Sequence, residues 1–283
     1  MKFGTGFPLI ALNDVGAARD FAQTYDGAGF DYLTAAGHLL ATTADRYEGR
    51  PPMTFAGPFI DPFVLFGYLS GQTSRIHFVT SILILPLYET AVVAKQAAEL
   101  DFVSGGRFEL GVGISWQEAE YRAVGQDVHR RGARLGEQVE VLKLFWTKPY
   151  FSFKGKFHDI DNMGLNKLPS KPIPLWFGST LEEAPVRRAA KHADGWMPMA
   201  DPTETLPRFK QYMTEAGRNP SSLQLMSRVT AGDGGPDAWI SEGKRLQGIG
   251  ATHLTIGAPP DLTGAAASQR IIEAKNALSG ALG

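Results

Sequence analysis

Eight short apolar segments recur along this chain of 283 residues, and their number and spacing constrain the fold more than any other feature. Several are apolar on successive residues rather than on alternate ones, as in FELGVGI and IHFVTSILIL. That pattern is typical of strands that are buried on both faces of a parallel sheet. The eight predicted strands begin near Phe3, Asp31, Ile76, Phe108, Ile173, Asp194, Leu223 and Thr252.

Helical patterns fill the intervals between the predicted strands. In one of them Leu135, Val139, Leu142 and Trp146 share a face, as apolar residues do on a helix that packs against a sheet. Eight strands alternating with helices predict a (β/α)8 TIM barrel. A doubly wound sheet is the alternative, but that fold rarely needs eight such units.

Two intervals are longer than the others and predict insertions, one after the second strand and one before the fifth. The first covers roughly residues 39–61 and contains the aromatic residues Phe55 and Phe59. Because it follows a strand, we expect it at the C-terminal face, where barrel enzymes hold their active sites. The second, roughly residues 149–171, reads YFSFKGKFHDI and predicts a small hairpin. No linker divides the chain, which predicts a single domain over residues 1–283.

The composition excludes several kinds of chemistry. The chain has no cysteine, which rules out disulfides, thiolate nucleophiles and cysteine-based metal sites. With 28 basic and 29 acidic side chains its formal net charge is −1, which argues against binding nucleic acid or a membrane surface by charge. No secretory signal is recognisable, and the most apolar run, residues 78–88, is too short to span a membrane. A cytoplasmic protein is therefore the expectation.

The positions of the histidines single out one candidate for acid–base chemistry. His77 and His253 fall at strand starts, the face that serves barrel stability, whereas His38 lies just after the second strand. A lone histidine is more often structural than catalytic, but the position of His38 after a strand raises the catalytic interpretation to equal standing, so both stay open. No two histidines have the spacing of joint metal ligands, and neither a Gly-x-Ser-x-Gly elbow nor a lysine at a strand end occurs. These absences disfavour metal, hydrolytic-triad and Schiff-base catalysis.

Two turns at the C-terminal face predict ligand binding or close packing. Gly111 and Gly113 end the fourth strand, where glycine lets either a ligand or a neighbouring strand approach the backbone closely. After the fifth strand, Thr180 and Glu183 have the spacing of a helix capping box, but Pro185 fits only the first turn of a helix and leaves the helix start open. The alternative is that free N–H groups and hydroxyls of this turn bind a phosphate. The third strand continues apolar past Ser81, which suggests a bulge at that residue.

Residues 98–125, AELDFVSGGRFELGVGISWQEAEYRAVG, resemble the signature region of the bacterial luciferase-like flavin and deazaflavin oxidoreductases. The string PLWFGS at residues 174–179, with the later ADGW at residues 193–196, is similar to the same family. The likeness runs in order from the first predicted strand to the sixth. It implies a (β/α)8 barrel that holds coenzyme F420 or FMN at its C-terminal mouth.

The resemblance also implies roles for individual residues. A non-prolyl cis peptide in the third strand, at Ser81–Ile82, would form a bulge behind the central ring of the cofactor. His38 matches a polar residue beside the reactive ring edge and is the implied catalytic residue. The cofactor wall would comprise Gly113, Ile114, Ser115, Trp116 and Gln117. The part that meets the phosphate or ribityl chain would comprise Phe177, Gly178, Ser179 and Thr180.

Three positions depart from the family pattern. Gly37 stands where many F420-dependent members have aspartate, and residues 199–202 lack the hydroxyl and lysine of some F420 dehydrogenases. FMN-dependent members often have arginine at the end of the fourth strand, where this chain has Ile114. The overall pattern is closest to the short, single-chain F420 branch. The first hypothesis is therefore an F420-dependent oxidoreductase that transfers a hydride to or from a small organic substrate.

Two alternatives stay open at this point. One is an FMN-dependent monooxygenase that uses oxygen and receives reduced flavin from a separate reductase. The other is a cofactor-free barrel that acts as a binding subunit. In the enzymatic interpretations an apolar substrate would be covered by Phe55, Phe59, Phe63 and Trp116, although Phe63 serves at least equally well as a loop anchor. The family resemblance also implies a homodimer.

Overall fold

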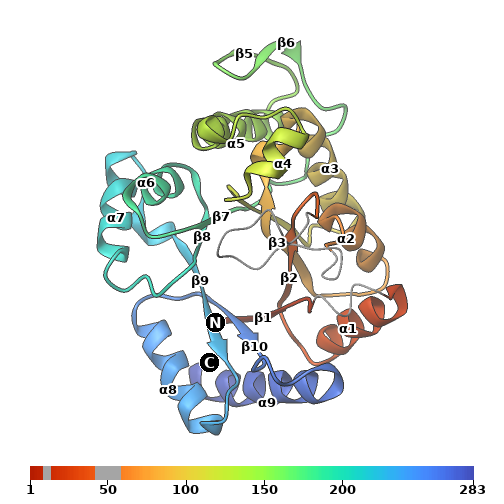
Figure 1. Ribbon diagram of the computed structural model, residues 1–283, viewed down its shortest axis with the longest axis vertical. Helices are drawn as coiled ribbons and strands as arrows, with labels where there is room; N and C mark the ends of the chain where they lie inside the picture. Colours follow the sequence, from red (N-terminus) through yellow and green to blue (C-terminus); the bar gives the residue numbers. More distant parts are fainter. Residues whose placement is uncertain (9–13, 42–58) are drawn as a thin grey trace.

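The computed structural model describes residues 1–8, 14–41 and 59–283, and a single parallel sheet forms its centre. The strands of that sheet are β1 (Lys2–Gly6), β2 (Tyr32–Gly37), β3 (His77–Ile84), β4 (Phe108–Gly113), β7 (Leu175–Ser179), β8 (Gly195–Pro198), β9 (Gln224–Thr230) and β10 (His253–Gly257). They close into a barrel in the order β1-β10-β9-β8-β7-β4-β3-β2 (Figure 1). Each predicted strand forms one of these eight, so the prediction of a (β/α)8 barrel is confirmed.

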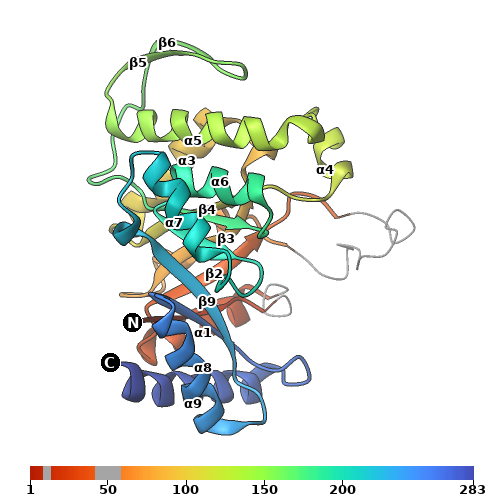
Figure 2. The same ribbon diagram turned by 90° about the vertical axis from the view of Figure 1, so that its left-hand side faces the viewer.

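Helices surround the barrel and cover the outer face of the sheet (Figures 1 and 2). They are α1 (Val15–Gly27), α2 (Pro62–Ser70), α3 (Thr90–Val103), α4 (Glu118–Ala123), α5 (Arg131–Thr147), α6 (Glu183–His192), α7 (Leu206–Glu215), α8 (Gly235–Gly248) and α9 (Gly264–Leu282). The predicted apolar stripe on α5 is buried, with Leu135, Val139 and Leu142 each at most 2% exposed. Because helices cover the sheet outside and side chains fill it inside, its strands are apolar on both faces.

The insertion before the fifth barrel strand is a hairpin, as predicted. Its strands, β5 (Phe151–Lys154) and β6 (Asp159–Met163), pair antiparallel and lie on the far side of α5 from the barrel (Figure 2). Glu137 of α5 holds the hairpin turn, because its carboxylate accepts the backbone N–H groups of residues 156–158. The insertion after the second strand falls mostly on residues 42–58, which lie outside the described residues.

Strand β3 contains the predicted bulge. The Ser81–Ile82 peptide bond is cis, and the register of β3 against β4 shifts between Val79 and Leu83. The buried Thr80 side chain bridges the irregular stretch, since its Oγ1 accepts from Gly111 N and donates to Gly111 O, both at 2.7 Å. At the bulge, side-chain hydrogen bonds therefore join the two strands where regular backbone pairing is interrupted.

The N-terminal end of the barrel lumen is closed by a polar cluster of His77, Glu109, Trp176 and His253, which we name the lower plug. Glu109 Oε2 accepts a hydrogen bond from Trp176 Nε1 at 2.6 Å, and His77 Nδ1 lies 3.2 Å from Glu109 Oε1. The Trp176 and His253 rings meet edge to face with their centroids 4.7 Å apart. A cavity of only about 10 Å³ is left there, so this end is packed shut. His77 and His253 both lie at the N-terminal face of the barrel, as the sequence analysis predicted.

Candidate functional site

The C-terminal mouth of the barrel holds a small cavity of about 190 Å³ beside the β3 bulge. Met197 and Met226 contribute apolar surface to it, and among its described lining residues only Arg228 is charged. Four of the predicted cofactor-binding residues line this cavity, namely Ser81, Ile82, Ile114 and Gly178. The structure thus brings together residues from β3, β7 and the end of β4 around a space that suits a flat, largely apolar group.

Close packing against the bulge explains the glycines at the ends of β4 and β7. A Cβ atom on Gly178 would lie 2.6 Å from Ile82 Cγ2, and one on Gly111 would lie 1.8 Å from the Thr80 carbonyl oxygen. A Cβ atom on Gly113 would lie 3.0 Å from Ile82 Cδ1. Contacts with β3 therefore exclude a side chain at Gly111 and crowd one at Gly113 and Gly178, before any ligand is considered.

The rest of the predicted wall after β4 does not line the described cavities. Ser115 and Gln117 are buried, and Gln117 N donates to Ser115 Oγ at 3.0 Å. Gln117 Nε2 reaches the Leu40 carbonyl oxygen at 3.4 Å, which ties this segment to the chain after β2. The Trp116 side chain is 40% exposed. Of the predicted wall, only Ile114 faces the small cavity.

The turn after β7 uses its side chains mainly for packing. Phe177 is 2% exposed and belongs to the core. Ser179 Oγ accepts a hydrogen bond from Trp196 Nε1 at 2.9 Å, so this hydroxyl holds a core indole in place. Thr180 is exposed. Of the two hydroxyls predicted to meet a phosphate, only that of Thr180 is presented to solvent.

The predicted capping box at this turn is wrong. Helix α6 begins at Glu183, with Glu182 as its N-cap residue and no side-chain capping hydrogen bond. Pro185 sets this start, because proline is tolerated in the first turn of a helix but not further inside it. Thr180 consequently precedes the N-cap by two residues and cannot cap the helix.

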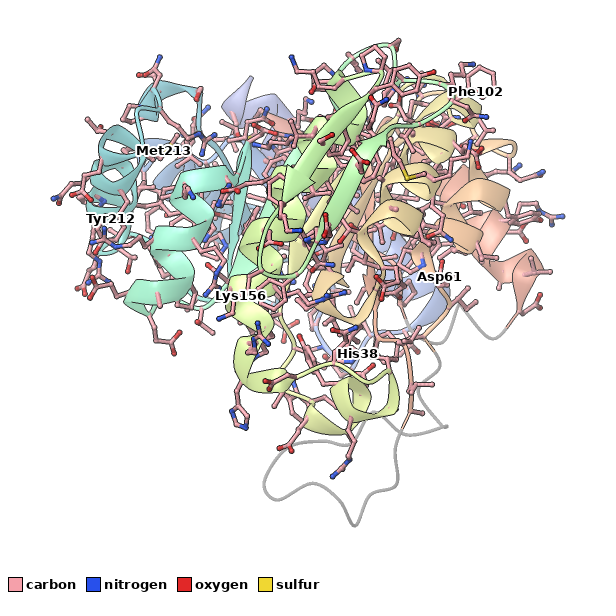
Figure 3. The ribbon with its side chains drawn as sticks, turned by 90° about the horizontal axis from the view of Figure 1, so that it is seen from above. His38, Asp61, Phe102, Lys156, Tyr212 and Met213 are labelled. Carbon is pink, nitrogen blue, oxygen red and sulfur yellow. The ribbon has the colours of Figure 1, made fainter. Side chains whose placement is uncertain are left out.

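His38 follows β2 as predicted, and a carboxylate that the sequence did not single out holds it. His38 Nδ1 lies 2.8 Å from Glu120 Oε2, and Glu120 Oε1 accepts the backbone N–H groups of Leu39 and Leu40 at 2.8 and 3.1 Å. The Glu120 side chain, on α4, is 1% exposed, whereas that of His38 is 16% exposed. Figure 3 labels His38, which lies beside α4. Because an ionised carboxylate only accepts hydrogen bonds, His38 Nδ1 donates and Nε2 is the nitrogen available to a ligand.

The aromatic residues near His38 divide into two kinds. The Phe59 ring lies against the His38 imidazole, with centroids 5.1 Å apart. Phe63 is 7% exposed and packs on Phe108 with a centroid distance of 5.8 Å, which supports its interpretation as an anchor. Phe55 lies outside the described residues.

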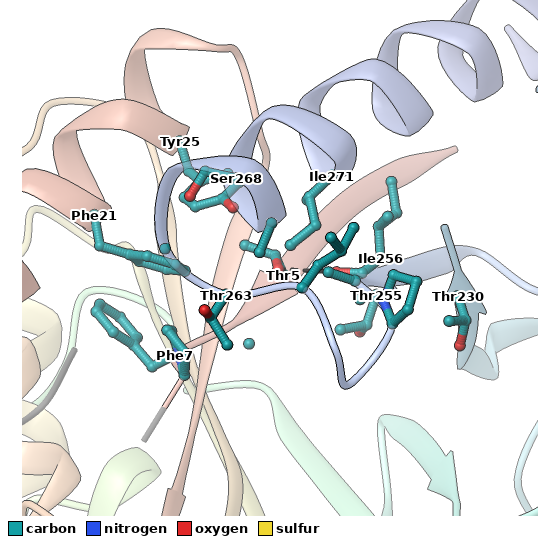
Figure 4. A pocket seen from close by; sticks show the side chains of 18 of the residues that line it. Thr5, Phe7, Phe21, Tyr25, Thr230, Thr255, Ile256, Thr263, Ser268 and Ile271 are labelled. Atoms are coloured by element: carbon teal, nitrogen blue, oxygen red, sulfur yellow. Dashed lines mark hydrogen bonds between the residues drawn. The ribbon is translucent and has the colours of Figure 1, made fainter. Parts of the chain in front are cut away.

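A second, larger cavity of about 890 Å³ opens at the mouth. It lies between the ends of β1, β9 and β10 and the helices α1 and α9, and Phe7 and Phe21 form part of its wall (Figure 4). Thr34, Arg228 and Thr255 line both the large and the small cavity. The two spaces therefore meet at these three residues.

Sequence reasoning did not select two polar residues of the mouth, Glu120 and Arg228. Glu120 meets His38 from 82 residues away, so no local spacing points to it. Arg228 did offer a signal, because it interrupts the apolar run LQLMSRV of the seventh barrel strand. A charged residue near the C-terminal end of a barrel strand is a candidate site residue.

Within residues 1–8, 14–41 and 59–283, no three His, Asp or Glu side chains are grouped so that they could hold a metal ion. No helix in the same part of the chain has the length and apolar character that crossing a membrane requires.

Known proteins resemble this chain in sequence and in fold. An uncharacterised protein of Mycobacterium tuberculosis is 36% identical over 259 residues, covering 87% of this chain and 86% of the relative. An F420-dependent secondary alcohol dehydrogenase, solved with an F420–acetone adduct, has a TM-score of 0.76 at 19% identity and 98% coverage of both chains. Monooxygenase RslO1 from Streptomyces bottropensis has a TM-score of 0.77 at 18% identity, covering 100% of this chain and 98% of its own. Residues 4–232 match the model of the luciferase-like monooxygenases, and the chain therefore belongs to that family.

Proposed function

We propose that this protein is an F420-dependent oxidoreductase that transfers a hydride between the deazaflavin and a small organic substrate. The observation that carries the proposal is the small cavity against the Ser81–Ile82 bulge, with Ile114 as its wall at the end of β4. The family resemblance places arginine at this position in many FMN-dependent members. Isoleucine offers no charge to a flavin phosphate, which favours the deazaflavin.

The residues present fit a flat ring cofactor. Ile82, Ile114 and Met197 line the small cavity with apolar side chains, and the large cavity adjoins it. Together the two cavities give a cofactor and its substrate about the space that small-molecule sites occupy, which is roughly 300–1,000 Å³. When bound there, F420 supplies the hydride-carrying carbon, while the protein supplies binding and orientation. The exposed Thr180 hydroxyl is the side chain of the β7 turn that is available to the cofactor tail.

His38 is the residue that we assign to proton transfer. Glu120 fixes the ring through Nδ1, which leaves Nε2 to give or take a proton on the substrate. Histidine is the side chain that most often serves as a general acid or base in enzymes. His38 does not line either described cavity, so its reach to a bound substrate is part of the proposal.

Direct binding of the two cofactors tests the proposal. We expect the purified protein, titrated with F420 and with FMN and followed by fluorescence, to bind F420 at least about tenfold more tightly, a difference of about 1.4 kcal/mol. Tight FMN binding without F420 binding would overturn the proposal in favour of an FMN-dependent monooxygenase. Binding of neither cofactor would favour a cofactor-free barrel.

Replacement of His38 tests the catalytic assignment separately. We expect His38→Ala to lower the single-turnover rate of reduced F420 with a substrate of the wild type by about 10²–10⁴-fold, the usual contribution of a general acid or base. The Kd for F420 should stay unchanged. His129→Ala, at an exposed histidine, is the matched control. A His38→Ala variant with full turnover would remove His38 from the mechanism.

A further inference from the structure

Arg228 points into the barrel mouth, as the alternation of β9 dictates. Successive side chains of a strand face opposite sides of the sheet, so residues two apart share a face. Met226 packs inside the lumen with Tyr32 and Trp176. Arg228 is two residues further on and pairs in register with Thr255, whose Oγ1 meets the Tyr32 hydroxyl at 3.0 Å. The guanidinium group therefore belongs to the upper lumen, near the C-terminal end of β9.

The charge of Arg228 is not balanced by its described neighbours. Its guanidinium forms no hydrogen bond and no ion pair with any residue in the described ranges. By contrast, Arg245 is paired with Asp201 at 2.8 Å. The other charged residue in the described lining of the two cavities is Asp20, which is already paired with Arg19 at 2.7 Å. The mouth therefore presents one uncompensated positive charge among these residues.

The surroundings of Arg228 leave room for a ligand. Gly257 lies opposite Thr230 in the register of β9 and β10, and Gly6 lies opposite Thr34 in that of β1 and β2. All four residues line the large cavity, and the two glycines contribute no side chain at this level of the lumen. Arg228 is thus flanked by threonine hydroxyls and open space.

The large cavity continues from Arg228 toward an apolar region. Phe7, Phe21, Ile256 and Ile271 line it, with Phe7 and Phe21 at one side and with Ile256 on β10 and Ile271 on α9 (Figure 4). In the other direction Arg228 borders the small cavity and its bulge. A ligand held at Arg228 would have its apolar body in the large cavity and would lie next to the proposed cofactor site.

We propose that Arg228 binds the carboxylate of an apolar organic acid, and that this acid is the substrate class of the enzyme. Arginine presents N–H donors in a planar fork that matches a carboxylate with two parallel hydrogen bonds. One guanidinium balances one negative charge, which favours a carboxylate over a phosphate dianion. The assignment of the acid as substrate rests on the proposed function, whereas the binding of the acid does not.

Matched acids and amides test the inference. The probes are hexanoate, octanoate and 3-phenylpropionate, each compared with its neutral primary amide by calorimetric titration at low ionic strength. We expect the wild type to bind at least one acid about tenfold or more tightly than its amide, as a charge-assisted hydrogen-bonded pair provides. We expect Arg228→Met to lose this preference while its affinity for the amide stays the same. Arg228→Lys should keep part of the preference, and Thr230→Val should keep nearly all of it.

Three outcomes would overturn the inference. The first is equal binding of every acid and its amide by the wild type. The second is an undiminished acid preference in Arg228→Met that retains the wild-type circular dichroism spectrum. The third is a tenfold loss of F420 or FMN affinity in Arg228→Met without any acid present, because Arg228 would then belong to the cofactor site. If the wild type binds neither cofactor, the proposed function fails, and the acid–amide pairs still decide whether Arg228 binds a carboxylate.

Discussion

At the N-terminal end of the lumen, Glu109 accepts a hydrogen bond from Trp176 and lies 3.2 Å from His77, and the space left over is about 10 Å³. At the C-terminal end, Arg228 has no ion pair with a described residue and borders cavities of about 890 and 190 Å³. The hydrogen bond between Trp176 and Glu109 belongs to the packing of a closed end, whereas a charged group left without a partner beside a cavity is available to a ligand. The contrast follows the division of labour of (β/α)8 barrels, in which one face serves stability and the other holds the site.

The pKa values of the residues in the lower plug also reflect its closed packing. Burial raises the pKa of Glu109, but the contacts with His77 and Trp176 outweigh it, so this pKa lies below its usual range. Burial, together with the charge of Lys2, lowers the pKa of His253 to about 4. The lower plug is therefore arranged for an ionised carboxylate beside a neutral His253.

The largest effect that separates the two ends is expected for a truncation in the lower plug. Trp176 is 1% exposed, and Trp176→Ala would leave a void and remove the indole donor to Glu109. We expect it to lower the free energy of unfolding by about 3–5 kcal/mol in guanidinium titrations. Arg228→Met at the open end should change it by about 0.5 kcal/mol or less. Similar losses for the two variants would contradict the assigned roles.

The pH dependence of stability tests the lower plug by a second route. The pKa of His253 is about 4 in the folded protein and about 6.5 in the unfolded chain, so the unfolded state binds more protons between these values. The contribution of a neutral His253 is complete above about pH 6.5. It is lost as the pH falls toward 4, and the loss is on the order of 3 kcal/mol.

Histidine variants isolate this contribution. His192, whose pKa burial also lowers to about 4, adds a similar dependence in the wild type. The measurement is therefore the difference between the unfolding curves of His253→Gln and the wild type from pH 4 to 7. His253→Gln should flatten the pH dependence, and His129→Gln, at an exposed position, should not. An unchanged slope in His253→Gln would show that His253 takes up its proton without opposing the fold.

The smallest expected effect concerns the pair that positions His38 at the open end. In Glu120→Gln the amide oxygen can still accept the N–H groups of Leu39 and Leu40, but the amide NH₂ cannot accept from His38 Nδ1. We expect turnover to fall about tenfold, equivalent to about 1.4 kcal/mol. The Kd for F420 and the free energy of unfolding should change little, and Glu120→Asp should restore part of the rate. A loss of stability as large as that of Trp176→Ala would place Glu120 with the structural residues.

Local patterns predicted the scaffold well, because each barrel strand can be recognised from the apolar run of its own few residues. The apolar run of β3 and the motif resemblance together located the bulge at Ser81–Ile82, and the spacing before the fifth strand located the hairpin. The same local reasoning failed at Thr180, where spacing alone suggested a cap. Helix α6 begins at Glu183 instead, because Pro185 is tolerated only in the first turn of a helix.

Site residues were harder to predict, because their partners are distant in the sequence. The glycines at the end of β4 were open to two interpretations until the structure showed the carbonyl of Thr80 and the side chain of Ile82 against them. Ser115 and Gln117 matched a family motif, yet they bond with each other and with Leu40 instead of lining a described cavity.

By itself, the sequence determined the number of strands, their alternation with helices, the absence of cysteine chemistry and the family, because these depend on local periodicity and on motifs. Only the tertiary structure decided which polar residues are satisfied and which are left for a ligand. Glu120 and His38 are 82 residues apart. Arg228 and Thr34, which are far apart in the sequence, both line the two cavities of the mouth. Whether a charge is balanced depends on neighbours that come together only when the barrel closes.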